Sequence, residues 1–176
     1  NLLEYITGQE ATEICAELTT FVEGRRLDDD GNVLVRLSGG ARGVLYASQV
    51  CVGEENNLNI RIYGDRGGLK WEQQSPNSLV VTSLEGRDEI VRAGVNNSLS
   101  QAAMFGTRLP GGHPEGFIGA FANIYRAFAE SIRSGQPGDH PTVHDGVRGM
   151  AFLAALVENS QGDAKWTTIN IPRQSL

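Results

Sequence analysis

The feature that most constrains the fold is a change of hydrophobic period part-way along the chain. From Leu58 to Gly64 (LNIRIYG), apolar and polar residues alternate strictly, as they do on a half-buried strand. From Pro114 onward, the apolar residues recur at helical spacing instead. They form one stripe: Phe117, Phe121, Ile124, Phe128 and Ile132. Strands followed by helices are typical of an α+β domain.

Short strands separated by tight turns are predicted for residues 11–84. The turns are the sequences LDDDGN, GGARG, EENN and GDRGG. The first of them spans Leu27 to Asn32, with the next strand starting at Asn32. Connections this short join antiparallel neighbours, because parallel strands need a long crossover. We therefore expect an antiparallel meander of about six strands.

Helices are predicted for residues 114–160 and a final strand for residues 165–171. The first helix is expected to end at Ser134-Gly135, and the second runs from about Val143 to Asn159. The segment 87–109 contains the polar run GVNNSLS, which favours a long loop or an irregular strand.

These elements predict a single α+β domain over residues 1–176, with an open, mainly antiparallel sheet and helices packed on one of its faces. Val, Ile, Phe and Trp residues leave the other sheet face apolar. Because an uncovered apolar face needs a partner, we expect a homo-oligomer that associates through the sheet face.

Composition excludes several classes of protein. The 176 residues are 40% hydrophobic and 20% charged, as in a folded globular chain. The net charge of −6 does not favour nucleic acid or an anionic membrane as a partner. The cysteines, Cys15 and Cys51, lie in apolar, strand-like runs, which indicates buried, reduced thiols and a cytoplasmic protein.

Motifs that carry chemistry on their own are not found in the sequence. No G-x-G-x-x-G lies between a strand and a helix, so no Rossmann domain is expected in this chain; GGARG and GDRGG read as hairpin turns. His140 and His144 are spaced four apart beside two aspartates, which raises the possibility of a metal site. Pro141 lies between them and opposes a shared helix face, so we interpret them as a loop and a helix start capped by Thr142 or Asp145. No metal site is predicted.

The stretch PGGHPEGF, from Pro110 to Phe117, is the most unusual one. Its glycines allow a close backbone approach, and His113 precedes a proline suited to a first helical turn. Two interpretations stay open: His113 contacts a polar ligand, or it belongs to a well-formed helix start and only packs or caps there.

The opening NLLEYITG has the end of a helix, with Gly8 as its C-cap, but no N-terminal signal. This pattern suggests a further segment upstream. A trimmed or frayed terminus is the alternative.

Three segments in this order resemble the Gfo/Idh/MocA oxidoreductases, the glucose–fructose oxidoreductase and inositol dehydrogenase family. They are GVLYASQVCVGEENNLNIRIYGDRGGLKWEQQSPN, GHPEGFIGAFANIYRAF and PTVHDGVRGMAFLAALVENSQGDAKW. The resemblance covers essentially the whole chain. It implies the family's C-terminal domain, with the open sheet of a dihydrodipicolinate-reductase-like domain, and without the N-terminal Rossmann domain that binds NAD(P).

The resemblance also implies a function. The parent would be an NAD(P)-dependent oxidoreductase acting on a sugar, polyol or related carbinol, and this chain its substrate-binding and oligomerisation domain. The family's catalytic Lys, Asp and His match no residue here, so no catalytic residue is assigned and the chain alone is expected to be inactive. The loop before the first long helix lies near the substrate in the family, which implies substrate contacts by His113, Arg108 and Glu115. The alternative is a stand-alone, non-catalytic sheet protein that serves as a ligand-binding or assembly module.

Overall fold

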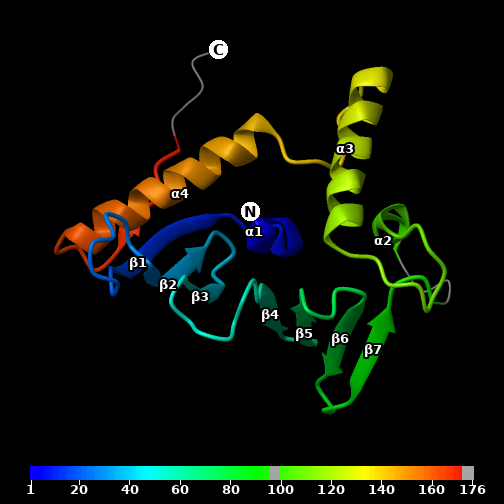
Figure 1. Ribbon diagram of the computed structural model, residues 1–176, viewed down its shortest axis with the longest axis horizontal. Coiled ribbons are helices and arrows are strands. Elements are labelled where there is room, and N and C mark those ends of the chain that lie inside the picture. Colours follow the sequence, from blue (N-terminus) through cyan, green and yellow to red (C-terminus); the bar gives the residue numbers. More distant parts are fainter. Residues whose placement is uncertain (96–99, 172–176) are drawn as a thin grey trace. The chain divides into compact units, whose positions relative to one another are not determined.

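The computed structural model describes residues 1–95 and 100–171, which form parts of two compact units. Unit 1 combines residues 1–53 with the described residues from Pro141 onward, and unit 2 consists of residues 54–140. Unit 2 is therefore an insertion in the chain of unit 1, between its third strand and its long helix. The elements are coloured along the chain in Figure 1.

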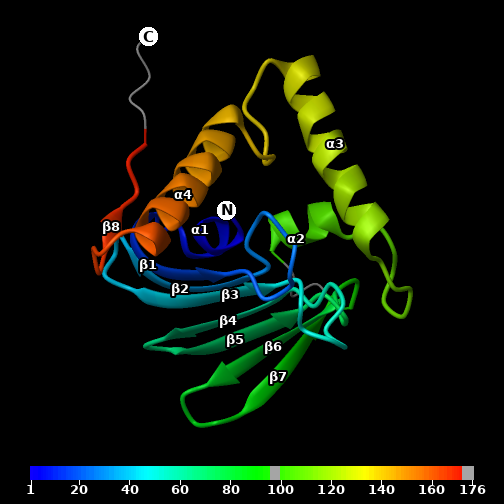
Figure 2. The same ribbon diagram turned by 60° about the vertical axis from the view of Figure 1, so that its left-hand side comes forward.

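Unit 1 is a four-stranded sheet with a long helix on one face. Its elements are α1 (Leu2–Thr7), β1 (Ala11–Thr19), β2 (Asp30–Leu37), β3 (Arg42–Ser48), α4 (Val143–Gln161) and β8 (Thr167–Thr168). The strands pair antiparallel in the order β3-β2-β1-β8. Figure 2 shows α4 lying across this sheet, with β8 at the edge beside β1.

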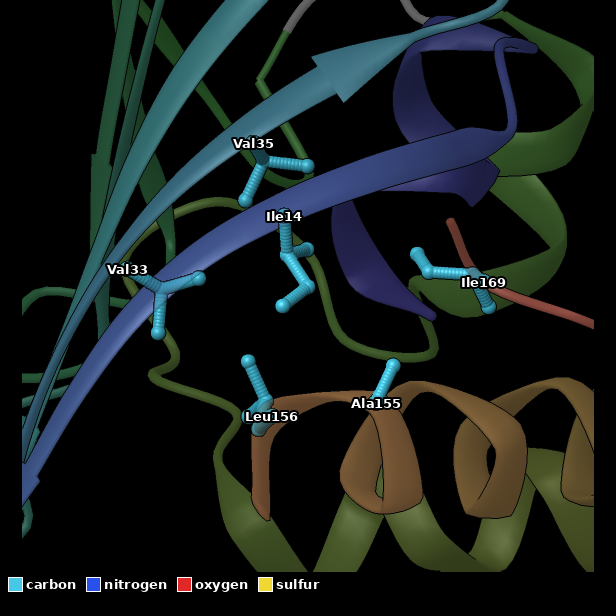
Figure 3. Close-up of a cluster of buried hydrophobic side chains, with 6 residues drawn as sticks. All are labelled: Ile14, Val33, Val35, Ala155, Leu156 and Ile169. Atoms are coloured by element: carbon cyan, nitrogen blue, oxygen red, sulfur yellow. The ribbon is translucent and has the colours of Figure 1, made fainter. Parts of the chain in front are cut away.

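The core of unit 1 lies between α4 and the sheet. Alternate residues of β2, Val33 and Val35, face the helix and are buried, while Leu34 between them is exposed on the opposite face. Ile14 of β1 has no exposed surface and packs with Leu156 and Ala155 of α4 (Figure 3). The inward-facing alternate residues of the strands and the apolar residues of α4 therefore pack together in one core.

Asn159 of α4 completes the edge of β1. Strand β8 is short, so it pairs with β1 only at Glu13 and Ile14. Further along β1, the backbone N–H of Ala16 donates to Asn159 Oδ1 at 2.6 Å. Asn159 Nδ2 in turn donates to Ala164 O at 2.9 Å and to Thr167 Oγ1 at 3.0 Å. This buried amide takes the place of a missing strand partner.

Arg148 of α4 connects α1 to the rest of unit 1. Its guanidinium, only 8% exposed, pairs with Glu4 of α1 and with Glu10. Glu4 Oε1 also accepts the N–H of Ala11 at 2.8 Å. Burial by itself raises the pKa of Glu4, but the hydrogen bonds from Arg148 and Ala11 outweigh it and lower that pKa. The carboxylate is thus kept ionised beside the buried cation.

Unit 2 contains a second antiparallel sheet and two helices. Its strands are β4 (Asn59–Gly64), β5 (Gly67–Glu72), β6 (Ser78–Ser83) and β7 (Asp88–Arg92), paired in sequence order. Its helices are α2 (Gln101–Gly106) and α3 (Phe117–Ser134). The stripe predicted from Phe117 to Ile132 lies on α3, and Gly135 ends the helix in the left-handed conformation, as predicted.

The α+β class and the antiparallel pairing are confirmed, but several predicted boundaries differ from the structure. The strands form two four-stranded sheets instead of one meander. Strand β2 begins at Asp30, inside the predicted turn, because the Asp29 carboxylate closes that turn earlier by accepting the N–H groups of Phe21 and Val22. The prediction of a single domain over residues 1–176 stays a prediction.

The prediction of a loop or irregular strand for residues 87–109 was wrong for helix α2, while β7 is a regular strand within that segment. Strand β7 and helix α2 lie within it, although part of the polar run GVNNSLS falls on residues 96–99, outside the described residues. The predicted strand over residues 165–171 is reduced to Thr167–Thr168, because the side chain of Asn159 binds the next part of the β1 edge.

Replacing Asn159 tests its role at the edge of β1. Asn159→Ala leaves the partly buried N–H of Ala16 without its acceptor, and we expect the free energy of unfolding to fall by about 1–3 kcal/mol. The measurement is urea denaturation followed by circular dichroism. The control is Glu158→Ala, an exposed neighbour on the same helix. Equal stability of the two variants would contradict the assignment.

Candidate functional site

The three predicted site residues all lie in the connection between α2 and α3 of unit 2. This connection, residues 107–116, is called the α2–α3 loop below. Its middle is fixed to the end of the sheet, because the N–H of Gly111 donates to Gly94 O at 2.8 Å. Gly94 has a φ of +71°, and a Cβ there would come within 2.6 Å of Leu109 O. Glycine is therefore required at this close approach.

Glu115 joins the two ends of the α2–α3 loop. Its carboxylate accepts the backbone N–H of Arg108, at 3.1 and 2.9 Å to its two oxygens, and that of Leu109 at 3.3 Å. Its backbone is bound by the side chain of Asn77: the N–H of Glu115 donates to Asn77 Oδ1 at 3.1 Å, and Asn77 Nδ2 donates to Glu115 O at 2.7 Å. Much of the hydrogen-bonding capacity of Glu115 is thus used within the protein.

Arg108 lies at the start of the loop, beside the first turns of α3. Its Nε and Nη2 both donate to Asn123 Oδ1, at 2.9 and 2.6 Å. Asn123 Nδ2 donates to Gly106 O at 2.8 Å, which ties the same amide to the end of α2. Arg108 is exposed, and a guanidinium has five N–H groups, so donors remain for an external acceptor.

His113 is exposed near the middle of the loop. Its Nδ1 lies 3.2 Å from Pro110 O, the carbonyl that also accepts the N–H of His113. A carbonyl oxygen can only accept, so the tautomer that carries its proton on Nδ1 satisfies this contact. In that tautomer Nε2 is an acceptor, suited to a hydroxyl group.

The loop therefore carries an imidazole, a guanidinium and a carboxylate. Hydroxyl groups both donate and accept, so they can use a neutral imidazole nitrogen and the remaining guanidinium N–H groups. These groups suit an uncharged, hydroxyl-rich molecule better than a proton-transfer reaction, because within the described part of the chain no side chain bridges them into a relay.

The interpretation of His140 and His144 as a loop and a helix start is confirmed. His140 Nε2 lies 3.0 Å from Ser131 Oγ. Thr142 caps α4, and Asp145 completes a capping box with it. The hydrogen bonds from Thr142 lower the pKa of Asp145. Among the described residues, no group of three or more His, Cys, Asp or Glu side chains is placed to hold a metal ion.

A polar cluster in unit 1 was missed by the sequence analysis. The hydroxyl of Tyr46 lies 3.0 Å from Cys51 Sγ and 2.8 Å from Asp30 Oδ1. These contacts raise the pKa of Tyr46 to about 12, and the hydrogen bond with Cys51 has a larger effect than the one with Asp30. Neither Cys15 nor Cys51 is fully buried, contrary to the expectation for both thiols. No pattern in the sequence brings Tyr46, Cys51 and Asp30 together.

Residues 1–70 match the family model described as the GFO/IDH/MocA C-terminal domain. A crystal structure of an oxidoreductase from Sinorhizobium meliloti is 38% identical to the chain, with a TM-score of 0.88 over 93% of this chain and 48% of that one. The first 70 residues are thus similar to the C-terminal domain of the GFO/IDH/MocA family. The α+β architecture of the chain is that of the C-terminal domain in these relatives.

Other relatives of this chain are more distant. The uncharacterized oxidoreductase YfiI of Bacillus subtilis is 26% identical over 163 residues, which are 88% of this chain and 41% of that protein. An inositol dehydrogenase homolog from Azotobacter vinelandii, complexed with NADH and myo-inositol, is 25% identical, with a TM-score of 0.87 over 95% of this chain and 46% of that one. The chain thus spans less than half the length of these relatives.

The glycine-rich turns of this chain do not fit a dinucleotide. GGARG connects β2 to β3, and GDRGG connects β4 to β5, so each is a hairpin turn as predicted. Neither is followed by a helix whose N-terminus would meet a pyrophosphate.

Among the described helices, none has both the length and the apolar character needed to cross a membrane.

A pair of glycine substitutions tests the close approach that holds the α2–α3 loop. Gly94 and Gly112 both have positive φ, but a Cβ at Gly112 meets no atom within 4 Å. Alanine strains the backbone at both positions, and only Gly94→Ala also collides with Leu109 O and Gly111 N. We expect Gly94→Ala to lower the free energy of unfolding by about 1–3 kcal/mol more than Gly112→Ala, measured by chemical denaturation. Equal losses would contradict the packing of Gly94 against the loop.

Proposed function

We propose that this chain is the C-terminal substrate-binding and oligomerisation domain of an NAD(P)-dependent oxidoreductase that acts on a sugar, a polyol or a related carbinol. The match to an oxidoreductase structure over 93% of the chain at 38% identity carries this proposal. The relatives are about twice as long, which leaves room in each of them for a cofactor domain. NAD(P) would be held by residues outside this chain.

The chemistry of the parent would be divided between its two parts. NAD(P), when bound, accepts or supplies a hydride at the substrate's carbinol carbon. The catalytic Lys, Asp and His of the family would also lie outside this chain. The 176-residue chain would bind and orient substrate without turning it over by itself.

The α2–α3 loop would supply the polar contacts to substrate. His113 Nε2 would accept a hydrogen bond from a substrate hydroxyl, and the remaining N–H groups of Arg108 would donate to hydroxyl oxygens. Glu115 would contribute through the carboxylate that closes the loop. The myo-inositol bound in the Azotobacter vinelandii homolog supports a polyhydroxylated substrate for the same class of protein.

Replacing His113 tests the substrate site. In the protein expressed from the complete reading frame, His113→Ala removes one hydrogen bond to an uncharged hydroxyl, which is worth about 0.5–1.5 kcal/mol. We therefore expect KM for a polyol such as myo-inositol to rise about twofold to tenfold. Initial rates with NAD+ at varied polyol concentration give this value.

The control for that experiment is His144→Ala, which removes the exposed imidazole at the start of α4. Its KM should match that of the wild type. Unchanged KM and kcat for His113→Ala would remove His113 from the substrate site and leave it a role at the helix start.

We also propose that a sheet face mediates homo-oligomerisation. One face of the unit 1 sheet is covered by α4, and the other carries the neighbouring residues Cys15, Leu34 and Val44, paired across β1, β2 and β3. Val44 is 78% exposed and Leu34 is 47% exposed. An apolar row at the centre of a sheet face suits a symmetric interface between two copies.

A charge on this row tests the interface. Val44→Glu would place a carboxylate against its own symmetry mate or against apolar side chains, and we expect the dissociation constant of the oligomer to rise at least about tenfold. Sedimentation velocity over a range of concentrations measures it. Val52→Glu, at a fully exposed position after β3, is the matched control. An oligomer unaffected by Val44→Glu would place the interface elsewhere.

The alternative, a stand-alone ligand-binding or assembly module, differs from the oxidoreductase proposal in what the gene encodes upstream of Asn1. Reading the DNA upstream of the Asn1 codon separates the two: the oxidoreductase proposal requires an in-frame strand–GxGxxG–helix unit, and a start codon adjacent to Asn1 would overturn it. A cytoplasmic location is part of the proposal, since Cys15 and Cys51 are both free thiols.

A further inference from the structure

The side chain of Asn77 connects the α2–α3 loop to the sheet of unit 2. Asn77 lies in the turn between β5 and β6, and its backbone carbonyl accepts the N–H of Ala93, just beyond β7, at 2.9 Å. Its side-chain amide binds both backbone polar groups of Glu115. One residue therefore pairs with the end of β7 through its main chain and with the loop through its side chain.

Glu115 transmits this attachment to the start of the loop. Its backbone is held by Asn77, and its carboxylate holds the N–H groups of Arg108 and Leu109. The two hydrogen bonds from Asn77 and those of the Glu115 carboxylate are called the Asn77–Glu115 bridge below. Both ends of the segment that carries His113 are fixed by this bridge.

His113 itself has no comparable support. The contacts described for its side chain are local, to Pro110 three positions earlier. The loop backbone thus sets the position of the imidazole. That backbone is held by the bridge and by the hydrogen bond between Gly94 and Gly111. Small displacements of a substrate-binding group cost affinity, so a residue that fixes this backbone affects binding without touching the ligand.

We propose that Asn77 is a positioning residue for substrate recognition, which acts through the backbone of Glu115 to hold His113 in place. This inference rests on the proposed function, because it takes His113 as the residue that contacts substrate. It assigns to Asn77 a role at a distance: Asn77 orients the loop and makes no contact with substrate.

The first test measures the loop directly in the 176-residue chain. Asn77→Ala removes both hydrogen bonds to Glu115, whereas Asn77→Asp keeps the acceptor for the Glu115 N–H and loses the donor to Glu115 O. We expect hydrogen exchange at the amides of Arg108, Leu109 and Glu115, followed by NMR, to accelerate at least about tenfold in Asn77→Ala and by less in Asn77→Asp.

Two comparisons separate this effect from general destabilisation. Asn59→Ala is the matched control, because the one hydrogen bond described for the side-chain amide of that exposed strand residue goes to Asn57 O, at 3.3 Å. The amides of Val33 and Val35 report on unit 1, which the substitution should leave unchanged. If the loop amides of Asn77→Ala exchange as slowly as those of Asn59→Ala, the positioning role is overturned.

The second test asks whether the bridge acts through His113. In the protein expressed from the complete reading frame, with NAD+ and myo-inositol as probes, Asn77→Ala should raise KM several-fold at unchanged kcat. The same substitution should have little further effect on KM in the His113→Ala background. If Asn77→Ala raises KM by the same factor in the His113→Ala background as in the wild type, the positioning role is overturned. If His113→Ala by itself leaves KM unchanged, the proposed contact between His113 and substrate fails, and the exchange measurement alone decides whether Asn77 fixes the loop.

Discussion

The hydrogen bonds between α4 and the open edge of β1 are the interaction on which unit 1 depends. Asn159 and the N–H of Ala16 lie 143 positions apart in the sequence, and Ser160 Oγ accepts the N–H of Leu18 in the same way. Without them, the edge of β1 beyond the short β8 would be left without partners on that side. The same helix buries Ile14, so the apolar core and the polar edge are closed by one element.

Unit 2 is inserted between β3 and α4, and the entropic cost of closing so long a loop grows only slowly with its length.

Much of the fold is predictable because it rests on local periodicity. The strict alternation around Ile60 and the stripe on α3 predicted their elements, and Gly135 predicted where α3 ends. The elements that were not clearly predicted have weak local signals. Strand β7 (DEIVR) has only two apolar residues, and α2 is a short helix, capped by Ser100, that follows a polar run. The shortness of β8 depends on Asn159, whose pairing with a distant strand no local pattern shows.

The candidate site was predictable as a segment but not as a network. His113 and Glu115 stand out because proline and glycine surround them in the sequence, whereas Arg108 was indicated only by the family resemblance. Their partners come from elsewhere: Asn77 is 38 positions from Glu115, and Asn123 is 15 positions from Arg108. These contacts change the interpretation of the charged residues. Glu115 and Arg108 use hydrogen bonds to shape the loop, so the imidazole of His113 carries most of the proposed recognition of substrate.

The measurement that tests this account most directly is a crystal structure of the protein from the complete reading frame, with NAD+ and myo-inositol bound. The account predicts that His113 Nε2 lies within hydrogen-bonding distance, about 3 Å, of a substrate hydroxyl. It also predicts that the α2–α3 loop keeps its attachment to Asn77. A ligand bound elsewhere, with His113 facing solvent, would contradict the account.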